Sequence, residues 1–333
     1  MHRYSPTAGL PALRDAIVAK TGRDSGLEVD PAHVTVSNGG KHGLFNVFQA
    51  LVDPATRSCC PRRTGSATLS RSPRRRDRRA AAHDGRRRLP RHRGPVGGGA
   101  HPATKALVFV SPSNPTGSVC TPDEIREIGR WAAAAGVWLV TDEIYEHLVY
   151  EGAQFASMPV VAPEITPRCG RQRRRQDLRD DRWRVGWSIA PPAVAAAINR
   201  VQSHVTSNVS SVAQRVALAA VEEPMSRIEA MRDAYDQRRR IVHEAFSGST
   251  TSCAPCRGGA FYVFPDVRAR LQRPVHGRTV TRSLELCNLL LDEIRVALVP
   301  GEAFGAPGHV RLSCALSDEE LRKGLTRIID VLQ

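Results

Sequence analysis

The chain has 333 residues, 41% of them hydrophobic and 24% charged, which is enough sequence for two lobes with a sizeable apolar core. We find no signal peptide and no apolar run near the length of about 18 residues that a membrane span requires, so we expect no membrane partner. The eight cysteines show no disulfide framework and the eleven histidines no HExxH-like pattern, which favours a reducing cytoplasm and no bound metal.

The formal net charge of +15 would normally indicate a nucleic-acid partner, but it is confined to two windows. Residues 55–98 hold 14 arginines and 2 aspartates, and residues 168–182 hold 7 arginines and 3 aspartates. The windows contribute +16, whereas the other residues, with 27 basic and 28 acidic side chains, carry −1. Because neither window has an aromatic side chain to stack on a base, we expect no nucleic-acid partner.

The first residues predict a helix, a strand and a glycine turn. The helix is expected over Pro11–Thr21 and the strand over His33–Val36. A Gly-Gly-Lys turn at residues 39–41 then leads into an apolar helix that begins near His42. Small residues at a helix N-terminus let backbone N–H groups bind a phosphate, although a two-glycine turn by itself is weak evidence.

A β-α-β unit is predicted between residues 108 and 145. VFVSPSNPTG and WLVTDEIY supply two apolar runs rich in β-branched residues. Thr121, Pro122 and Glu124 have the spacing of a capping box that begins the intervening helix, and Gly136 ends it.

Polar residues follow both strands of this unit. Asn114 comes after the first strand, and Asp142 and Tyr145 come after the second. In open α/β sheets ligands bind at the carboxyl ends of the strands. An amide, a carboxylate and a phenol that converge there would suit a polar aromatic ring.

The last part of the chain predicts helices and short strands. A long helical region is expected from about Pro192 to Phe246, followed by strands at Ala260–Phe264, Arg295–Val299 and Val310–Ser313. A final helix over Ser317–Leu332 begins with the capping box Ser317…Glu320.

These elements predict an α/β protein with two domains. We expect a large domain over residues 30–235, with a mostly parallel sheet sandwiched by helices. Residues 1–29 and 236–333 are expected to form a smaller α+β domain. The basic windows, about 55–100 and 169–182, fall inside the large domain.

Several motifs in order along the chain resemble one known family. They are YSPTAGLPALRDAI, VTVSNGGKHGLFNVFQALVDP, SPSNPTG, TDEIYEHLVY, WRVGWSIAPP, QSHVTSNVSSVAQ, GGAFYVFP and PGEAFGAPGHVRLSCALSDEEL. Together they resemble the pyridoxal-phosphate (PLP) aminotransferases of fold type I, class I/II, and the aspartate aminotransferase branch most closely. The resemblance covers most of the chain and fails in the two basic windows.

The resemblance implies roles for particular residues. Asp142 would pair with the pyridine nitrogen of the cofactor, and Tyr145 and Asn114 would donate hydrogen bonds to its 3′-oxygen. Arg311 would bind the substrate α-carboxylate, and Gly9 would line the substrate pocket together with Asn114. The residues implied at the cofactor phosphate are Gly40, Lys41, Arg184 and, from the partner subunit of a homodimer, Tyr4.

Each of these residues also has a plainer interpretation when taken alone. Asp142 could cap a helix, Asn114 could build a turn and Tyr145 could pack. Arg184 could be a solvated end of the basic run, and Arg311 a strand-edge residue. The order and spacing of the motifs favour the functional interpretation.

The basic windows have three interpretations: a solvated loop, an arginine-rich RNA-binding segment, or out-of-frame translation of GC-rich coding sequence. The third fits best. A nucleotide string for residues 169–183 can, one base over, encode Val-Val-Asn-Gly-Val-Ala-Lys-Thr-Tyr-Ala-Met-Thr-Gly. A string for residues 53–70 can, in another frame, encode Pro-Gly-Asp-Glu-Val-Val-Leu-Pro-Ala-Pro-Tyr-Trp-Val-Ser-Tyr-Pro. Both resemble family segments.

The chemical consequence concerns the family's Schiff-base lysine, which also moves the proton between substrate and cofactor. Alignment inward from WRVGW puts Gln176 at that position, so the lysine is absent. Gly65 stands where the aromatic that stacks on the cofactor is expected. The chain also starts almost directly at YSPTAG, which suggests an N-terminal truncation.

The resemblance implies an aminotransferase (EC 2.6.1 type) that moves an amino group between an L-amino acid and a 2-oxo acid, with aspartate and 2-oxoglutarate as the leading pair. Two alternatives stay open. One is a catalytically dead PLP-binding protein, either a pseudogene product or a regulator, and the other is a PLP-dependent carbon–sulfur lyase. The pair Cys253 and Cys256 has metal or redox spacing, but no second pair follows it.

Overall fold

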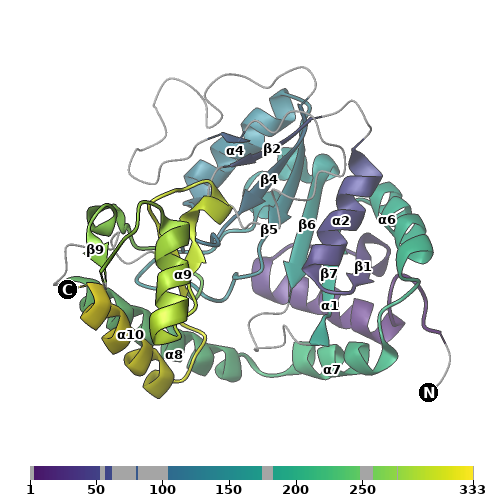
Figure 1. The fold of residues 1–333 in the computed structure, drawn as a ribbon. Helices are drawn as coiled ribbons and strands as arrows, with labels where there is room; N and C mark the ends of the chain where they lie inside the picture. Colours follow the sequence, from purple (N-terminus) through teal and green to yellow (C-terminus); the bar gives the residue numbers. More distant parts are fainter. Residues whose placement is uncertain are drawn as a thin grey trace.

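The computed structural model describes residues 4–52, 104–174, 183–247, 258–275 and 277–332, together with the strand residues 57–61 and 80–81. For residues 57–61, 80–81, 166–174 and 247 the description covers the backbone alone. Figure 1 shows a large sheet covered by helices and, beside it, a smaller unit drawn in green and yellow.

A mostly parallel sheet forms the centre of the larger unit. Its strands are β1 (Val34–Ser37), β2 (Arg57–Pro61), β3 (Ala80–Ala81), β4 (Thr104–Val110), β5 (Trp138–Asp142), β6 (Cys169–Arg174) and β7 (Gly186–Ile189). The strand order is β1-β7-β6-β5-β4-β2-β3, and β7 runs antiparallel to both of its neighbours. Both basic windows thus contribute backbone to this sheet, through β2, β3 and β6.

Alternating side chains of β4 explain why helices cover both faces of the sheet. Successive residues of a strand point to opposite faces. Leu107 and Phe109 pack with α4 (Pro122–Ala134) and α5 (Met158–Val161), next to the 3-10 turn η2 (Pro163–Arg168). Ala106 and Val108 pack with α2 (Gly40–Leu51) and α6 (Pro192–Val205) on the other face. The predicted sandwich of helices around a sheet is confirmed (Figure 1).

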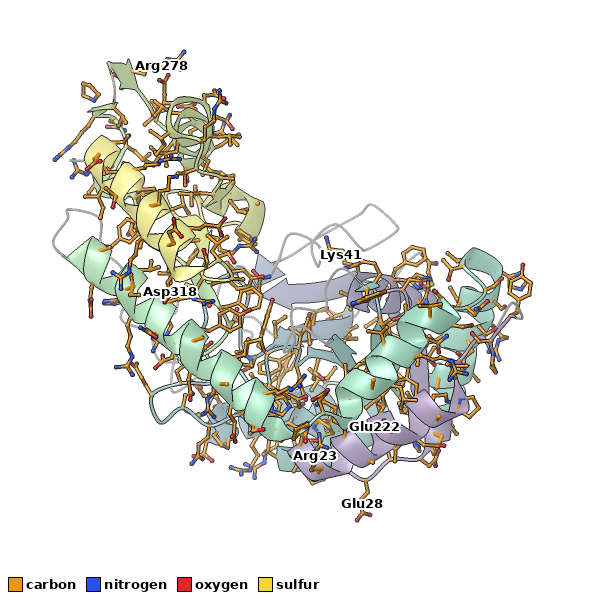
Figure 2. All side chains as sticks on the ribbon, turned by 90° about the horizontal axis from the view of Figure 1, so that it is seen from below. Arg23, Glu28, Lys41, Glu222, Arg278 and Asp318 are labelled. Atoms are coloured by element: carbon orange, nitrogen blue, oxygen red, sulfur yellow. The ribbon has the colours of Figure 1, made fainter. Side chains whose placement is uncertain are left out.

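The N-terminal helix α1 (Pro11–Ser25) belongs to this larger unit. Its side chains Leu13 and Ile17 are fully buried against β1 and β7, and α1 lies along α7 (Ser211–Glu222). Figure 2 shows Arg23 and Glu222 close together at the ends of these two helices. The prediction that residues 1–29 join the small domain is therefore wrong for α1, because its apolar stripe is buried by the large sheet.

The smaller unit has its own apolar core. The helix α8 (Met225–Ser247) leads into it, and Val242 and Phe246 of α8 are buried there with residues of α9 (Ser283–Ile294) and α10 (Asp318–Leu332). Three strands pair antiparallel in the order β11 (Val299–Pro300), β12 (Val310–Ser313) and β8 (Tyr262–Val263). The remaining elements are η1 (Pro31–His33), η4 (Arg268–Arg270), η5 (Gly301–Phe304), β9 (Pro274–Val275) and β10 (Arg278–Thr279).

Two boundaries in this part differ from the prediction. The expected helical region from 192 to 246 is three helices, α6, α7 and α8. The expected strand Arg295–Val299 is wrong: Arg295 adopts a left-handed conformation (φ 57°) that closes α9, so the strand begins only at Val299. No helix in the described part of the chain is both long and apolar enough to cross a membrane.

Candidate active site

Residues that follow β4 and β5 meet a residue from the smaller unit. Asn114 follows β4, Asp142 ends β5, and Tyr145 comes three residues later. Arg311 lies on β12, and its Nη1 donates a hydrogen bond of 2.8 Å to Oδ1 of Asn114. Asp142 and Arg311 both act electrostatically on the phenol of Tyr145. The structure therefore brings these four residues together at one edge of the sheet.

The phenol of Tyr145 is buried among other aromatic rings, with 2% of the residue exposed. Its hydroxyl donates a hydrogen bond of 3.3 Å to the hydroxyl of Tyr262, and the two rings meet edge to face. Burial raises the pKa of Tyr145 well above its ordinary value, and Tyr262 and Asp142 add to this rise while Arg311 opposes it. Tyr145 is therefore a neutral hydroxyl at physiological pH, which can donate one hydrogen bond.

The guanidinium of Arg311 is held between two rings. Its central carbon lies 4.4 Å from the centre of the Tyr262 ring and 5.2 Å from that of Phe304. Its Nε is buried and has no hydrogen-bond partner among the residues that the structure describes. A half-buried guanidinium with an unused donor suits a carboxylate, which can accept two parallel hydrogen bonds.

A second cluster lies at the N-terminus of α2, where Arg184 approaches the glycine turn. A Cβ placed on Gly39, which has a φ of 77°, would lie 2.8 Å from Nη2 of Arg184. A Cβ placed on Gly186 would lie 2.5 Å from the backbone nitrogen of Gly40. Only glycine allows both close approaches. A guanidinium beside a helix N-terminus is a favourable place for a phosphate.

Gly40 is the first residue of α2, and Lys41 follows it with an exposed side chain, labelled in Figure 2. The other predicted site residues are placed differently. Tyr4 is 90% exposed. Gly9, with a φ of 109°, packs against β1, where an added Cβ would lie 2.5 Å from Cγ2 of Val36. Gln176, Gly65, Cys253 and Cys256 lie outside the described residues.

One contact at this site was not predicted from the sequence, the contact between Tyr145 and Tyr262. Tyr262 lies in the motif GGAFYVF, whose aromatic residues read as a buried strand, and its partner Tyr145 is 117 residues away. Only the pairing of the two units brings the phenols together.

A buried ion-pair network behind Tyr145 was also missed. Nζ of Lys20 lies 2.5 Å from Oδ2 of Asp24 and 2.6 Å from Oε1 of Glu146, and Nε2 of His147 lies 3.1 Å from Oδ2 of Asp24. Although three of these side chains offer ligand atoms that could hold a metal ion, the Lys20 ammonium already lies between the two carboxylates, and Arg23 pairs with Asp24 as well. We interpret the cluster as a tie between α1 and the turn after Tyr145.

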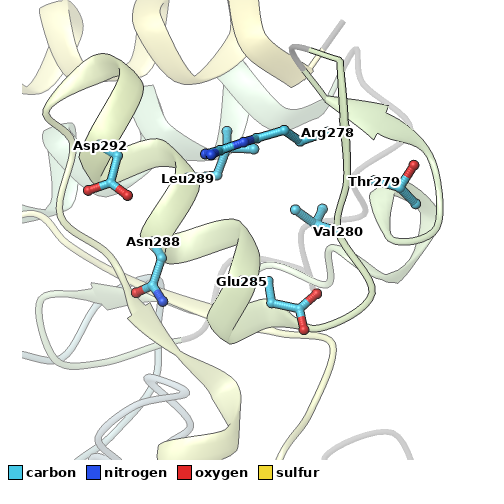
Figure 3. Close-up of a pocket in the computed structure, with 7 residues that line it drawn as sticks. All are labelled: Arg278, Thr279, Val280, Glu285, Asn288, Leu289 and Asp292. Atoms are coloured by element: carbon cyan, nitrogen blue, oxygen red, sulfur yellow. The ribbon is translucent and has the colours of Figure 1, made fainter.

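A further cavity of about 460 Å³ lies on the smaller unit, away from these clusters (Figure 3). Its polar side chains Glu285, Asn288 and Asp292 share one face of α9. Oε2 of Glu285 accepts hydrogen bonds of 2.8 and 3.0 Å from the backbone and hydroxyl of Thr281, so this carboxylate caps α9. None of the predicted site residues that the structure describes lines the cavity.

The fold is that of an α/β protein with a mostly parallel sheet, and its two clusters have the chemistry that a phosphorylated, nitrogen-containing ring would need. A carboxylate, a phenol and an amide fit the ring, while a guanidinium at a helix N-terminus fits the phosphate. The model of the family "Aminotransferase class I and II" matches residues 95–173 and 181–328. The chain belongs to this family, in which PLP is the cofactor.

Curated relatives and solved structures agree with this assignment. An aspartate aminotransferase of Streptomyces avermitilis is 44% identical over 99% of this chain and 82% of its own length. One from Geobacillus stearothermophilus is 34% identical over 98% and 82%. The structure of the Rhizobium meliloti aspartate aminotransferase matches with a TM-score of 0.88 at 27% identity, covering 99% of this chain and 84% of that one. These findings place the chain in the aspartate aminotransferase branch and confirm the predicted fold type I.

Proposed function

We propose that the site is built for transamination between aspartate and a 2-oxo acid such as 2-oxoglutarate. The observation that carries the proposal is the meeting of Arg311, Asn114, Tyr145 and Asp142 at the end of β5. The substrate comes from the relatives, whose names specify aspartate. Arg311 would pair with the α-carboxylate, which every amino acid and 2-oxo acid shares, and so hold each substrate in one orientation.

The cofactor would be held at its ring and at its phosphate. When bound, PLP supplies an electron sink for the substrate α-carbon. Asp142, which is half-buried, would keep the ring nitrogen protonated, since a nearby anion favours the charged form of its partner. Tyr145 and Asn114 would donate to the 3′-oxygen. Arg184, with Gly40 and Lys41 at the start of α2, would bind the phosphate.

We propose a homodimer in which Tyr4 reaches the phosphate in the partner subunit and Gly9 lines the substrate pocket. The 90% exposure of the Tyr4 side chain supports this, because an aromatic residue at a subunit interface is exposed in the isolated chain. We also propose that the protein works in the cytoplasm. Cys120, Cys287 and Cys314 are free thiols, which accords with a reducing compartment.

We further propose that residues 169–182 are translated out of frame and that the chain as written lacks the family's lysine. The two segments matched by the family model leave out residues 174–180, and this gap contains Gln176. β6 supports the same conclusion. It lies between β5 and β7 in a sheet with helices on both faces, where strands are normally apolar, yet its sequence is Cys-Gly-Arg-Gln-Arg-Arg.

A glutamine at position 176 favours a second candidate function, a protein that binds PLP without a covalent bond and does not turn over. Glutamine offers neither a nucleophilic amine nor a usable base. The loss of general acid–base catalysis alone removes on the order of 10²–10⁴-fold in rate.

Enzyme assays on two chains test these proposals. One is the chain as written, and the other carries residues 169–182 in the alternative frame, with a lysine at position 176. We expect the re-framed chain to convert aspartate and 2-oxoglutarate to oxaloacetate and glutamate, and the chain as written to show no turnover. Release of ammonia and a thiol from a sulfur amino acid, without glutamate formation, would instead identify a carbon–sulfur lyase.

A further inference from the structure

Two phenols from different units of the molecule share one hydrogen bond at the candidate site. The hydroxyl of Tyr145, which follows β5, lies 3.3 Å from the hydroxyl of Tyr262 on β8, and both groups are buried. The ring centroids are 5.9 Å apart with an interplanar angle of 89°. This edge-to-face contact fixes the position of one phenol relative to the other.

The number of protons on the two hydroxyls limits the hydrogen bonds that this pair can donate when a cofactor ring binds. A phenol carries one proton and can donate one hydrogen bond. In the structure, the hydroxyl of Tyr145 donates its one hydrogen bond to the hydroxyl of Tyr262. If Tyr145 donates to the 3′-oxygen of the cofactor, its contact with Tyr262 survives only when Tyr262 becomes the donor.

We propose that Tyr262 is a positioning residue that donates a hydrogen bond to Tyr145 and thereby strengthens the bond from Tyr145 to the cofactor 3′-oxygen. This inference rests on the proposed function. Hydrogen bonds in a chain polarise one another, so a phenol that accepts one bond is a better donor of the next. Tyr262 acts through Tyr145 and does not itself touch the cofactor.

The surroundings of the pair favour this direction. The guanidinium of Arg311 lies 4.4 Å from the centre of the Tyr262 ring. A cation over the ring stabilises negative charge on the phenol oxygen, which makes the hydroxyl a stronger donor. The charged and titratable groups that act on Tyr145 are Tyr262, Asp142 and Arg311. Tyr262 thus connects the end of the site that binds the ring with the end that binds the carboxylate.

The test uses the full chain and pyridoxamine 5′-phosphate, which has a primary amine in place of the aldehyde and needs no lysine to bind. Its 3′-hydroxyl changes near-ultraviolet absorbance when it ionises, so the pKa of this group can be titrated in the bound state. A donor to the 3′-oxygen stabilises the ionised form. Tyr262→Phe should therefore raise the pKa of the bound 3′-hydroxyl by about 0.3–0.6 and weaken binding roughly two- to fourfold.

A double-mutant cycle separates this effect from simple packing. In a Tyr145→Phe background, the added change Tyr262→Phe should leave the titration unchanged, because the residue through which it acts is gone. Tyr150→Phe is the matched control. Tyr150 is a tyrosine of the same aromatic cluster, and its buried hydroxyl has no hydrogen-bond partner among the described residues.

Each outcome decides between distinct conclusions. A pKa rise in Tyr262→Phe that vanishes in the Tyr145→Phe background, with no rise in Tyr150→Phe, supports the proposal. Equal titrations of wild type and Tyr262→Phe would overturn it, and so would an equal shift in both backgrounds. Failure of the wild-type chain to bind pyridoxamine 5′-phosphate would overturn the proposed function, and with it the role of Tyr262.

Discussion

Arg311 and Asn114 join the two units of the molecule through a hydrogen bond of 2.8 Å, from Nη1 of the arginine to Oδ1 of the amide, although 197 residues separate them. The same guanidinium lies over the Tyr262 ring. These two contacts fix the orientation of the guanidinium, so the protein itself sets the direction of its Nε before any ligand binds.

Arg311→Lys tests whether this orientation serves a carboxylate. A lysine keeps the charge but loses the paired donors of the guanidinium. We expect the chain loaded with pyridoxamine 5′-phosphate to bind succinate, a dicarboxylate without a reactive carbonyl, about 10- to 100-fold more weakly after the substitution. Titration calorimetry measures this, and binding of pyridoxamine 5′-phosphate itself serves as the control. Unchanged succinate affinity would show that the carboxylate binds elsewhere.

Gly186→Ala tests the close approach of β7 to the start of α2. The added methyl group would lie 2.5 Å from the backbone nitrogen of Gly40, so the helix N-terminus must move. We expect a loss of about 1–3 kcal/mol of unfolding free energy and weaker binding of pyridoxamine 5′-phosphate.

The matched control for this change is Gly324→Ala in α10, where the added methyl group would have, among the described residues, no atom within 4 Å apart from its own helix backbone and chain neighbours. Alanine is the better helix former, so this variant should gain up to about 1 kcal/mol. Urea denaturation compares the two, and equal stability of both variants would refute the packing argument.

Asp24→Asn tests the ion-pair network behind Tyr145. Burial, the largest influence, raises the pKa of Asp24, but hydrogen bonds from His147, Arg23 and Lys20 outweigh it and hold the pKa well below its ordinary value. A lowered pKa in the folded state contributes stability above the unfolded pKa of about 3.9, which is lost as the pH falls further. At pH 7 the variant should lose about 3 kcal/mol of unfolding free energy.

The pH dependence of this loss in unfolding free energy tests the role of the Asp24 charge more specifically than the size of the loss at pH 7. The difference in unfolding free energy between wild type and Asp24→Asn should shrink as the pH falls from about 5 to about 3. In this range Asp24 takes up a proton in the unfolded wild-type chain but stays ionised in the folded one. Denaturant unfolding at both pH values measures it. A difference that stays constant over this range would mean that the carboxylate charge contributes nothing.

The sequence predicted those parts of the fold that local rules decide. The capping box of α4 is present, with Glu124 accepting from the backbone of Thr121 at 2.9 Å and the Thr121 hydroxyl accepting from the backbone of Glu124. At the start of α10 the Ser317 hydroxyl accepts from the backbone of Glu320 and donates to its carboxylate, which gives the N-cap half of the predicted box. In both, residues three apart in the chain determine the contact.

Contacts between distant segments could not be predicted in this way. The residues near Leu13 and Ile17 do not indicate which sheet will bury these two side chains. The prediction from sequence therefore placed α1 in the wrong unit. The bond between Tyr145 and Tyr262 depends on how the two units pack. Arg295 ends α9 in a left-handed conformation that is unusual for a residue other than glycine, and the apolar run that follows therefore predicted a strand too early.

The central claim is that this chain is an aminotransferase whose cofactor lysine is missing from position 176. The most direct measurement is the intact mass of the chain after incubation with PLP and reduction with borohydride, for the chain as written and for the chain with residues 169–182 re-framed. We predict that the re-framed chain gains one reduced cofactor on the restored lysine and that the chain as written gains none. Stoichiometric labelling of the chain as written, or no labelling of the re-framed chain, would contradict the claim.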